Sequence, residues 1–192
     1  NAQLYQAALK RQGITLHLRV NPNSLEIVRN VGTPGSGADA GFIAQDVSAS
    51  QDAALFSAGQ IEIQPLFVFA SAELGRRSTL DDLRGRRIVM PPSGSATSKA
   101  AQQLLKLYDI TEINSQFTYL PIAEAAKALR ARKFDAGAFM LSAENPMIRE
   151  LASDSGLQLV PVTEAKAISN QLPFLRPVTL PRGIYNIADG IP

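Results

Sequence analysis

Residues 87–105 read RIVMPPSGSATSKAAQQLL, and in this stretch a short apolar run, a polar loop and an amphipathic segment follow one another. The run at 87–90 is typical of a buried strand. From residue 96, apolar positions recur at helical spacing, while lysine and glutamine occupy the opposite side. The stretch therefore predicts a strand over 87–90 and a helix over about 96–108 that packs one face on a sheet.

The loop between them follows the carboxyl end of the predicted strand, where the first amides of a helix can bind an anion. Gly94 permits close approach of the backbone, and Ser93, Ser95 and Thr97 offer hydroxyl donors to a carboxylate or phosphate. The same residue types are ordinary helix caps, so their chemistry alone favours a capping role and an anion-binding role equally. A P-loop is excluded, because no second glycine precedes Lys99.

The rest of the chain alternates helical and strand patterns, which predicts an α/β protein with mostly parallel sheets. Pro65 interrupts one strand and predicts an edge, a bend or a crossing between lobes. Further helices are predicted over 2–12, from 24, over 122–132, 146–154 and 163–170, and further strands over 14–20, 38–44, 61–70, 117–120, 135–141 and 157–162.

The tripeptide Asp-Ala-Gly opens a predicted strand after a helix twice, at Asp39 and at Asp135. This internal echo favours two similar α/β lobes. We predict that lobe one comprises residues 1–68 with 174–192, and that lobe two comprises residues 69–173.

Three more polar loops follow predicted strands, and any one of them alone is by default a cap or turn. Ligands of parallel sheets bind outside the carboxyl ends of strands, so their convergence there predicts a small-molecule site. Asp46 and Glu144 could form an acid/base pair, but a ligand-facing or structural role is favoured over catalysis. The candidate residues of these loops are Asn23, Ser24, Gln45, Asp46, Ser142 and Glu144.

Composition narrows the function classes. The chain has no cysteine and a single histidine, His17, which argues against thiolate metal sites, cysteine nucleophiles and a Ser-His-Asp triad. We expect no metal, no cofactor and no catalytic residues. The net charge is +2, and the basic run at 75–87 is compensated by Asp81 and Asp82, so nucleic acid is not an expected partner. No apolar stretch is long enough to span a membrane, so membrane attachment would need segments outside this chain.

Seven short motifs occur in an order that resembles a known family. They are PNSLEI, DAGFIAQD, LDDLRGRRIV, GSAT, the helix 124–129, the strand and loop 135–146, and LPRGIY. With them the chain resembles the TAXI-type solute-binding proteins of TRAP transporters, relatives of the NMT1/THI5-like type 2 periplasmic binding proteins. Pro22, Ile27 and Ala96 depart from the family pattern, so poorer approach of the backbone to a ligand is expected at these positions.

The resemblance implies two lobes that close over a cleft and capture a small anionic organic solute, such as glutamate or a dicarboxylate. It implies a periplasmic or extracytoplasmic location and a transporter or sensor as partner. One branch of the family is membrane-anchored, so the full-length protein could be anchored as well. The family's first strand and glycine-rich loop precede the position of Asn1, so lobe one is expected to lack them here. By their place in the motifs, the resemblance implies a ligand-binding role for Asn23, Ser24, Gln45, Asp46, Ser93, Gly94, Ser95, Thr97 and the loop 142–144. Tyr185 is expected to be a lid or wall residue of the site, or equally a core residue.

Two other functions remain open. A cytoplasmic transcriptional regulator can use the same fold as an effector-binding domain, and an upstream helix-turn-helix would favour it. An enzyme of the thiamine-precursor type is disfavoured, because the chain lacks the cysteines and histidines that such chemistry recruits.

Overall fold

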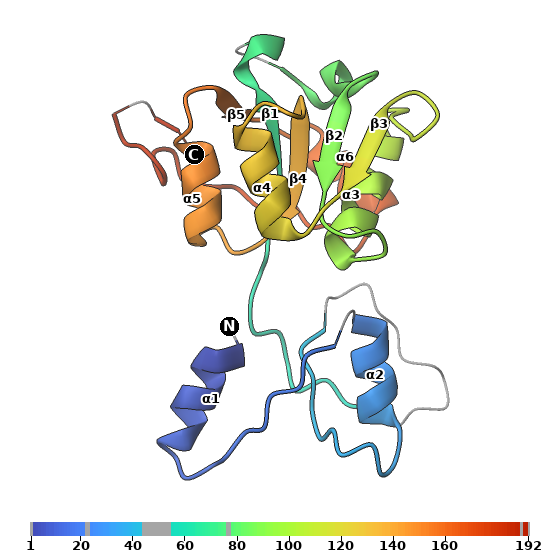
Figure 1. Ribbon diagram of the computed structural model, residues 1–192, viewed down its shortest axis with the longest axis vertical. Coiled ribbons are helices and arrows are strands. Elements are labelled where there is room, and N and C mark those ends of the chain that lie inside the picture. The colour runs from blue at the N-terminus through green and yellow to red at the C-terminus, as the bar shows by residue number, and fades with distance from the viewer. Residues whose placement is uncertain (1, 22–23, 44–54, 76–77, 189, 192) are drawn as a thin grey trace. The chain divides into compact units, whose positions relative to one another are not determined.

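The computed structural model describes residues 2–21, 24–43, 55–75, 78–188 and 190–191. The chain forms two compact units, Asn1–Phe56 and Ser57–Pro192. Figure 1 shows the helices and strands of each unit.

The second unit is built on one five-stranded sheet in the order β3-β2-β4-β1-β5. β2 runs parallel to β3 and β4, whereas β1 runs antiparallel to β4 and β5. The predicted α/β class is confirmed, but the sheet is mixed rather than mostly parallel. The reason is that β1 enters at the carboxyl edge of the parallel strands, where Leu66 pairs with Met140. The strands are β1 Leu66–Ser71, β2 Arg87–Met90, β3 Gln116–Tyr119, β4 Ala136–Met140 and β5 Leu157–Leu159.

Helices cover both faces of this sheet and give the unit three layers (Figure 1). α3 (Ala96–Lys106) and α6 (Ala165–Gln171) contribute to the core on one face. α4 (Ile122–Arg130) and α5 (Pro146–Ala152) contribute to the core on the other. The side chains of β1 alternate between the two cores, with Val68 and Ala70 in the first and Phe67 and Phe69 in the second. Short 3-10 helices lie at Ala72–Leu74 and Leu80–Leu83.

This arrangement differs from the predicted lobe boundaries. β1 spans the predicted boundary after residue 68 and belongs wholly to the sheet of the second unit. Residues 174–192, assigned to lobe one from the sequence, also lie in the second unit. There Leu180, Tyr185 and Ile191 pack against the core beneath α4 and α5.

The first unit contains α1 (Ala2–Lys10) and α2 (Ser24–Gly32), and its described residues form no strand. The predicted strand 14–20 and the described part of the predicted strand 38–44 are therefore wrong. Alternation of apolar residues selects a face, but a strand also needs a neighbour to receive its backbone hydrogen bonds. Without one, Val20 is 99% exposed.

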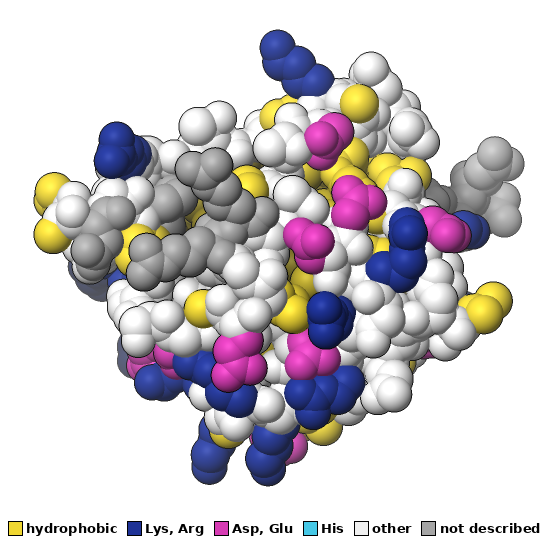
Figure 2. Space-filling model, turned by 90° about the horizontal axis from the view of Figure 1, so that it is seen from above, with side chains coloured by type: hydrophobic (Ala, Val, Ile, Leu, Met, Phe, Trp, Pro, Cys, Tyr) yellow, Lys and Arg dark blue, Asp and Glu magenta, His cyan; other side chains and the backbone are white. Residues whose placement is uncertain are grey.

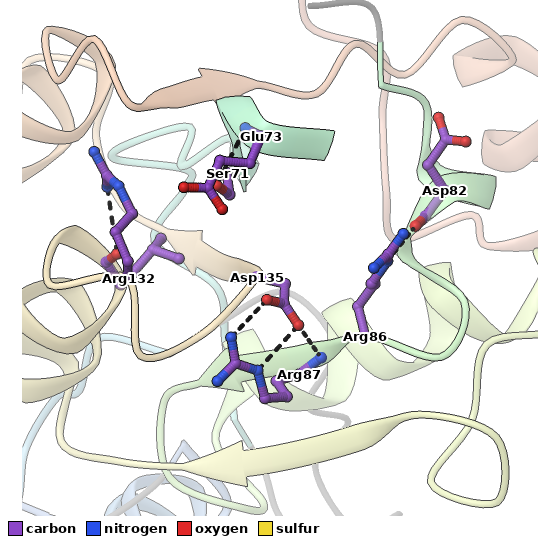
Figure 3. A network of polar contacts seen from close by, with 8 residues as sticks. Ser71, Glu73, Asp82, Arg86, Arg87, Arg132 and Asp135 are labelled. Atoms are coloured by element: carbon purple, nitrogen blue, oxygen red, sulfur yellow. Dashed lines mark hydrogen bonds and ion pairs between the residues drawn. The ribbon is translucent and has the colours of Figure 1, made fainter. Parts of the chain in front are cut away.

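One network of polar contacts holds the amino edge of the second sheet (Figure 3). The Asp135 carboxylate accepts hydrogen bonds from the Arg87 guanidinium at 2.7 and 3.1 Å and from the Arg87 amide at 2.9 Å. The backbone of Asp135 also donates to Arg87 O and accepts from Ser71 N. Asp135, the aspartate of the second Asp-Ala-Gly motif, thus links β1, β2 and β4 by hydrogen bonds.

In the part of the basic run at 75–87 that the structure describes, the arginines make hydrogen bonds within the protein. Arg84 donates to Tyr108 O at 2.8 Å, Arg86 donates to Asp82 O at 3.4 Å, and Arg87 binds Asp135. Figure 2 shows acidic and basic side chains intermixed on the face that it views. Such a surface presents no field of a single sign.

Candidate functional site

The three parallel strands bring their carboxyl ends to one edge of the sheet. Met90 pairs with Tyr119, and Val89 pairs with Gly137 of the adjacent β4. From this edge the chain continues through 91–95 into α3, through 120–121 into α4, and through 141–145 into α5.

The connections after β2 and β4 leave on opposite faces, although the two strands are neighbours. α3, which follows β2, packs in the core with α6, whereas α5, which follows β4, packs in the core with α4. This is a topological switch point, the place where open α/β sheets bind ligands. The predicted site residues at 93–95 and at 142–144 lie in the two loops that flank it, and Thr97 lies in the first turn of α3.

The helix cap at α3 is formed as its sequence suggests. The Ser95 hydroxyl accepts a hydrogen bond from the Ser98 amide at 3.2 Å. The Ser98 hydroxyl is fully buried and lies 3.0 Å from the carbonyl oxygens of Pro92 and of Ser95. The capping role is therefore confirmed for Ser95. Ser98 was not predicted, because a serine inside a helical pattern gives no signal that its hydroxyl closes the preceding loop.

The same helix start keeps two backbone donors. Among the described residues, no protein acceptor receives the amides of Ala96 and Thr97. Gly94 adopts φ +81°, and no heavy atom lies within 4 Å of the place a Cβ would take. Ser93 is exposed, whereas Thr97 is only 8% exposed, so its side chain belongs to the core side of α3. Capping and anion binding are thus compatible here, because they use different groups.

A second helix start lies at this edge, and the sequence analysis predicted the helix without counting its start among the candidate site residues. α4 has Pro121 at its N-cap position, and no side chain caps it. The chain is fixed there by a hydrogen bond from the Leu120 amide to Met90 O at 3.0 Å. The usable signal was the absence of Ser, Thr, Asn or Asp before the apolar run, since these are the residues that cap helices.

The loop after β4 is a compact turn. The Ser142 hydroxyl accepts a hydrogen bond from the Glu144 amide at 3.4 Å, and Glu144 itself is exposed. Asn145 caps α5 by accepting from the Met147 amide at 2.9 Å, with Pro146 at the first helical position.

The remaining predicted residues are not gathered at this edge. Ser24 begins α2 in the first unit, and Asn23, Gln45 and Asp46 lie outside the described residues. Tyr185 packs against the core beneath α4 and α5. Its hydroxyl is buried and has no hydrogen-bond partner among the described residues. Burial raises the pKa of Tyr185, and the charge of Arg149 lowers it by less.

Tyrosines with perturbed titration lie around α3. Burial, followed by a hydrogen bond to Glu112 at 2.5 Å, raises the pKa of Tyr119 to about 12. Burial and a hydrogen bond to Glu164 at 2.9 Å raise the pKa of Tyr108 to about 12. Both hydroxyls donate hydrogen bonds to carboxylates within the fold, and the raised pKa values extend their neutral range further into alkaline pH.

A groove of the second unit lies between α4 and α5. It encloses about 710 Å³ and includes Ala126 and Met147 in its lining. Arg130 pairs across it with Glu150 at 2.9 Å and with Asp154 at 3.6 Å, so its charges neutralise one another. Within the described ranges, no group of three or more acidic, histidine or cysteine side chains could hold a metal. None of the described helices is both long and apolar enough to cross a bilayer.

The sequence of residues 53–191 matches the NMT1-like family. The chain belongs to the NMT1-like family. This part of the chain contains the whole five-stranded sheet and both loops at the switch point.

Several solved structures similar to this NMT1-like chain are binding proteins by name. An ancestral arginine-binding protein bound to arginine is 16% identical, with a TM-score of 0.53 over 83% of this chain and 66% of that one. The alkanesulfonate-binding protein SsuA from Xanthomonas axonopodis pv. citri, bound to MOPS, is 20% identical, with a TM-score of 0.43 over 58% of this chain. A periplasmic binding protein from Brucella ovis with glutathione bound is 17% identical, with a TM-score of 0.42 over 53% of this chain.

The likeness to the arginine-binding protein supports the predicted α/β fold class. The NMT1-like chain spans 43% of the length of the Xanthomonas protein and 31% of the Brucella protein.

Proposed function

We propose that this NMT1-like protein is a non-enzymatic, extracytoplasmic solute-binding protein for a small anionic organic solute, a carboxylate such as glutamate or a dicarboxylate. Its motifs further favour the TAXI type, which delivers solutes to a TRAP transporter or a sensor in the membrane. The proposed ligand-binding residues at the switch point are Ser93, Gly94, Ser95 and Thr97, with Ser142 and Glu144 opposite. Asn23, Ser24, Gln45, Asp46 and Tyr185 are proposed as further ligand-binding residues on the strength of the sequence motifs alone.

One observation carries this proposal. The loops after β2 and β4 flank the switch point of the sheet, and one of them leads into the open N-terminus of α3. There the amides of Ala96 and Thr97 lack protein acceptors among the described residues, and Gly94 leaves the approach open. Backbone donors at the positive end of a helix favour an anion over a neutral or cationic group.

The experiment that tests this proposal is calorimetric titration with glutamate, C4 and C5 dicarboxylates, a short alkanesulfonate, arginine and inorganic phosphate. At least one organic anion should bind, and arginine and phosphate measure the selectivity for charge and shape. A folded protein that binds none of them would contradict the proposal.

The site itself is tested by Ala96→Pro. Ala96 is the first helical residue of α3, and Ser95 has φ −65° and ψ 156°, a conformation that a following proline accepts. The substitution therefore removes one free amide and keeps the helix. Loss of a hydrogen bond to a charged ligand should weaken binding by roughly tenfold to a hundredfold.

The matched control is Ser153→Ala. It alters an exposed serine at the carboxyl end of α5, whereas the proposed site lies at the amino end of that helix. It should leave affinity unchanged. If Ala96→Pro binds as tightly as the unsubstituted protein, and both are equally stable to heat, the anion is held elsewhere.

A further inference from the structure

The C-terminal strap is defined here as residues 180–188 with 190–191. Its backbone hydrogen bonds close on the strap itself. Ile184 donates to Pro181 O at 3.2 Å, and Ile191 donates to Asn186 O at 3.0 Å. Asn186 and Ile191 also form an isolated antiparallel bridge. Within the described residues, no backbone-to-backbone hydrogen bond joins the strap to the rest of the second unit.

Apolar packing contributes to the contact between the strap and the body of the unit. Leu180, Tyr185 and Ile191 pack against the core beneath α4 and α5. Ile187, by contrast, is 89% exposed. An isolated hairpin is only marginally stable in water, so the strap keeps its turn because these three side chains are docked.

One of the three docked side chains carries a cost. The Tyr185 hydroxyl is buried with no hydrogen-bond partner among the described residues. A buried polar group without a partner gives up its bonds to water and gains nothing in return. Phenylalanine would fill the same space without this loss, so the hydroxyl opposes docking of the strap.

We infer that the strap is a latch that opens independently of the sheet and, in the open state, presents the Tyr185 hydroxyl to solvent. In the closed state, the aromatic ring covers the core beneath α4 and α5, and the hydroxyl is hidden. Opening restores the hydrogen bonds of the hydroxyl to water while the sheet and its helices stay folded. The orphaned hydroxyl sets the balance between the two states.

Hydrogen exchange by mass spectrometry tests this inference, with the peptide covering residues 176–192 compared with peptides from β1, β2 and β4. The strap amides should exchange faster than those of the strands. Tyr185→Phe should slow exchange of the strap by on the order of tenfold, equal to about 1.4 kcal/mol, and leave the strands unchanged.

The matched control is Tyr108→Phe, which removes a hydroxyl that does have a partner, Glu164 at 2.9 Å. It should not slow exchange of the strap. A second variant, Ile191→Ala, weakens the apolar docking and should accelerate exchange of the strap alone. The inference is overturned if Tyr185→Phe leaves strap exchange unchanged or accelerates it, because the hydroxyl then has a partner when docked. It is equally overturned if strap and strands exchange at one common rate.

Discussion

Arg87 holds Asp135 through both of its carboxylate oxygens, with Nη2 2.7 Å from Oδ1 and Nε 3.1 Å from Oδ2. The Arg87 amide adds a third hydrogen bond to Oδ2. The hydrogen bond from the Arg87 side chain is the main reason that the pKa of Asp135 lies below its ordinary value. The contact fixes the amino ends of two parallel strands relative to each other.

Asp135→Asn should destabilise the second unit, because an amide cannot accept the bidentate contact of the guanidinium. The aspartate side chain is 24% exposed, so the expected loss is about 1–2 kcal/mol in the free energy of unfolding by urea at pH 7. Glu150→Gln, in an exposed ion pair with Arg130, is the control and should change stability by less than about 0.5 kcal/mol.

The difference between the unsubstituted protein and Asp135→Asn should depend on pH. A folded-state pKa below the ordinary 3.8 means that the stabilisation is complete above pH 3.8 and is lost as the pH falls through the folded value. Urea titrations between pH 7 and pH 3 should therefore show the two proteins converging at the acid end. A constant difference would mean that the charge of Asp135 does not contribute.

Alkaline pH should destabilise the protein through Tyr108 and Tyr119. Their pKa values are raised from 10 to about 12 in the folded state, so the unfolded chain loses these protons first. The contribution to stability is complete below pH 10 and is lost as the pH rises toward 12. Thermal unfolding between pH 9 and pH 12 should show a shallower fall in Tm for Tyr108→Phe with Tyr119→Phe, and an equal fall would contradict the assignment.

Gly137→Ala should destabilise the sheet by overpacking. A Cβ at residue 137 would lie 2.9 Å from Leu129 Cδ2 and 3.1 Å from Val89 Cγ1. The expected cost is about 1–3 kcal/mol in urea unfolding. If the contact with Leu129 is the cause, the same change in a Leu129→Ala background should cost less, and strict additivity would place the strain elsewhere.

Ser95→Ala should lower stability by about 1 kcal/mol even without ligand, because it removes the cap of α3. Ser93→Ala, at an exposed position in the same loop, should change stability by less than about 0.5 kcal/mol. Equal losses in thermal unfolding would show that the cap is not the reason. A binding defect of Ser95→Ala must therefore be judged against its own loss of stability.

Sequence pattern predicted the second unit well because its signals are local. The strand at 87–90 and the helix starts at Ala96, Ile122 and Pro146 agree with the structure, since caps, prolines and apolar spacing act within one turn. The direction of β1 could not be predicted, because alternation is the same for parallel and antiparallel neighbours. The pattern at 14–20 predicted a strand, but among the described residues no other strand pairs with it, and apolar alternation alone does not supply a neighbour.

The candidate site was predictable in part. The loops at 93–97 and 142–144 could be placed at strand ends from the order of elements alone. Two findings came from the structure: that α3 and α5 lie on opposite faces of the sheet, and that Ser95 caps the helix while no described residue accepts from the amides of Ala96 and Thr97. The burial of Thr97 depends on how α3 is rotated about its own axis against the sheet. The spacing of apolar residues in the sequence predicts that rotation only approximately.

The antiparallel placement of β1 has a consequence for synthesis on the ribosome. β1 is the first strand of the sheet to emerge, yet Ala70 pairs with Ala136 and Phe69 pairs with Leu159. Its apolar residues must therefore wait without their neighbours until β4 and β5 have been translated, at about 5–20 residues per second. During that interval the exposed side chains of Phe67 and Phe69 favour aggregation of the nascent chain. Chaperone dependence and expression yield should therefore respond more to substitutions in β1 than to those in β3.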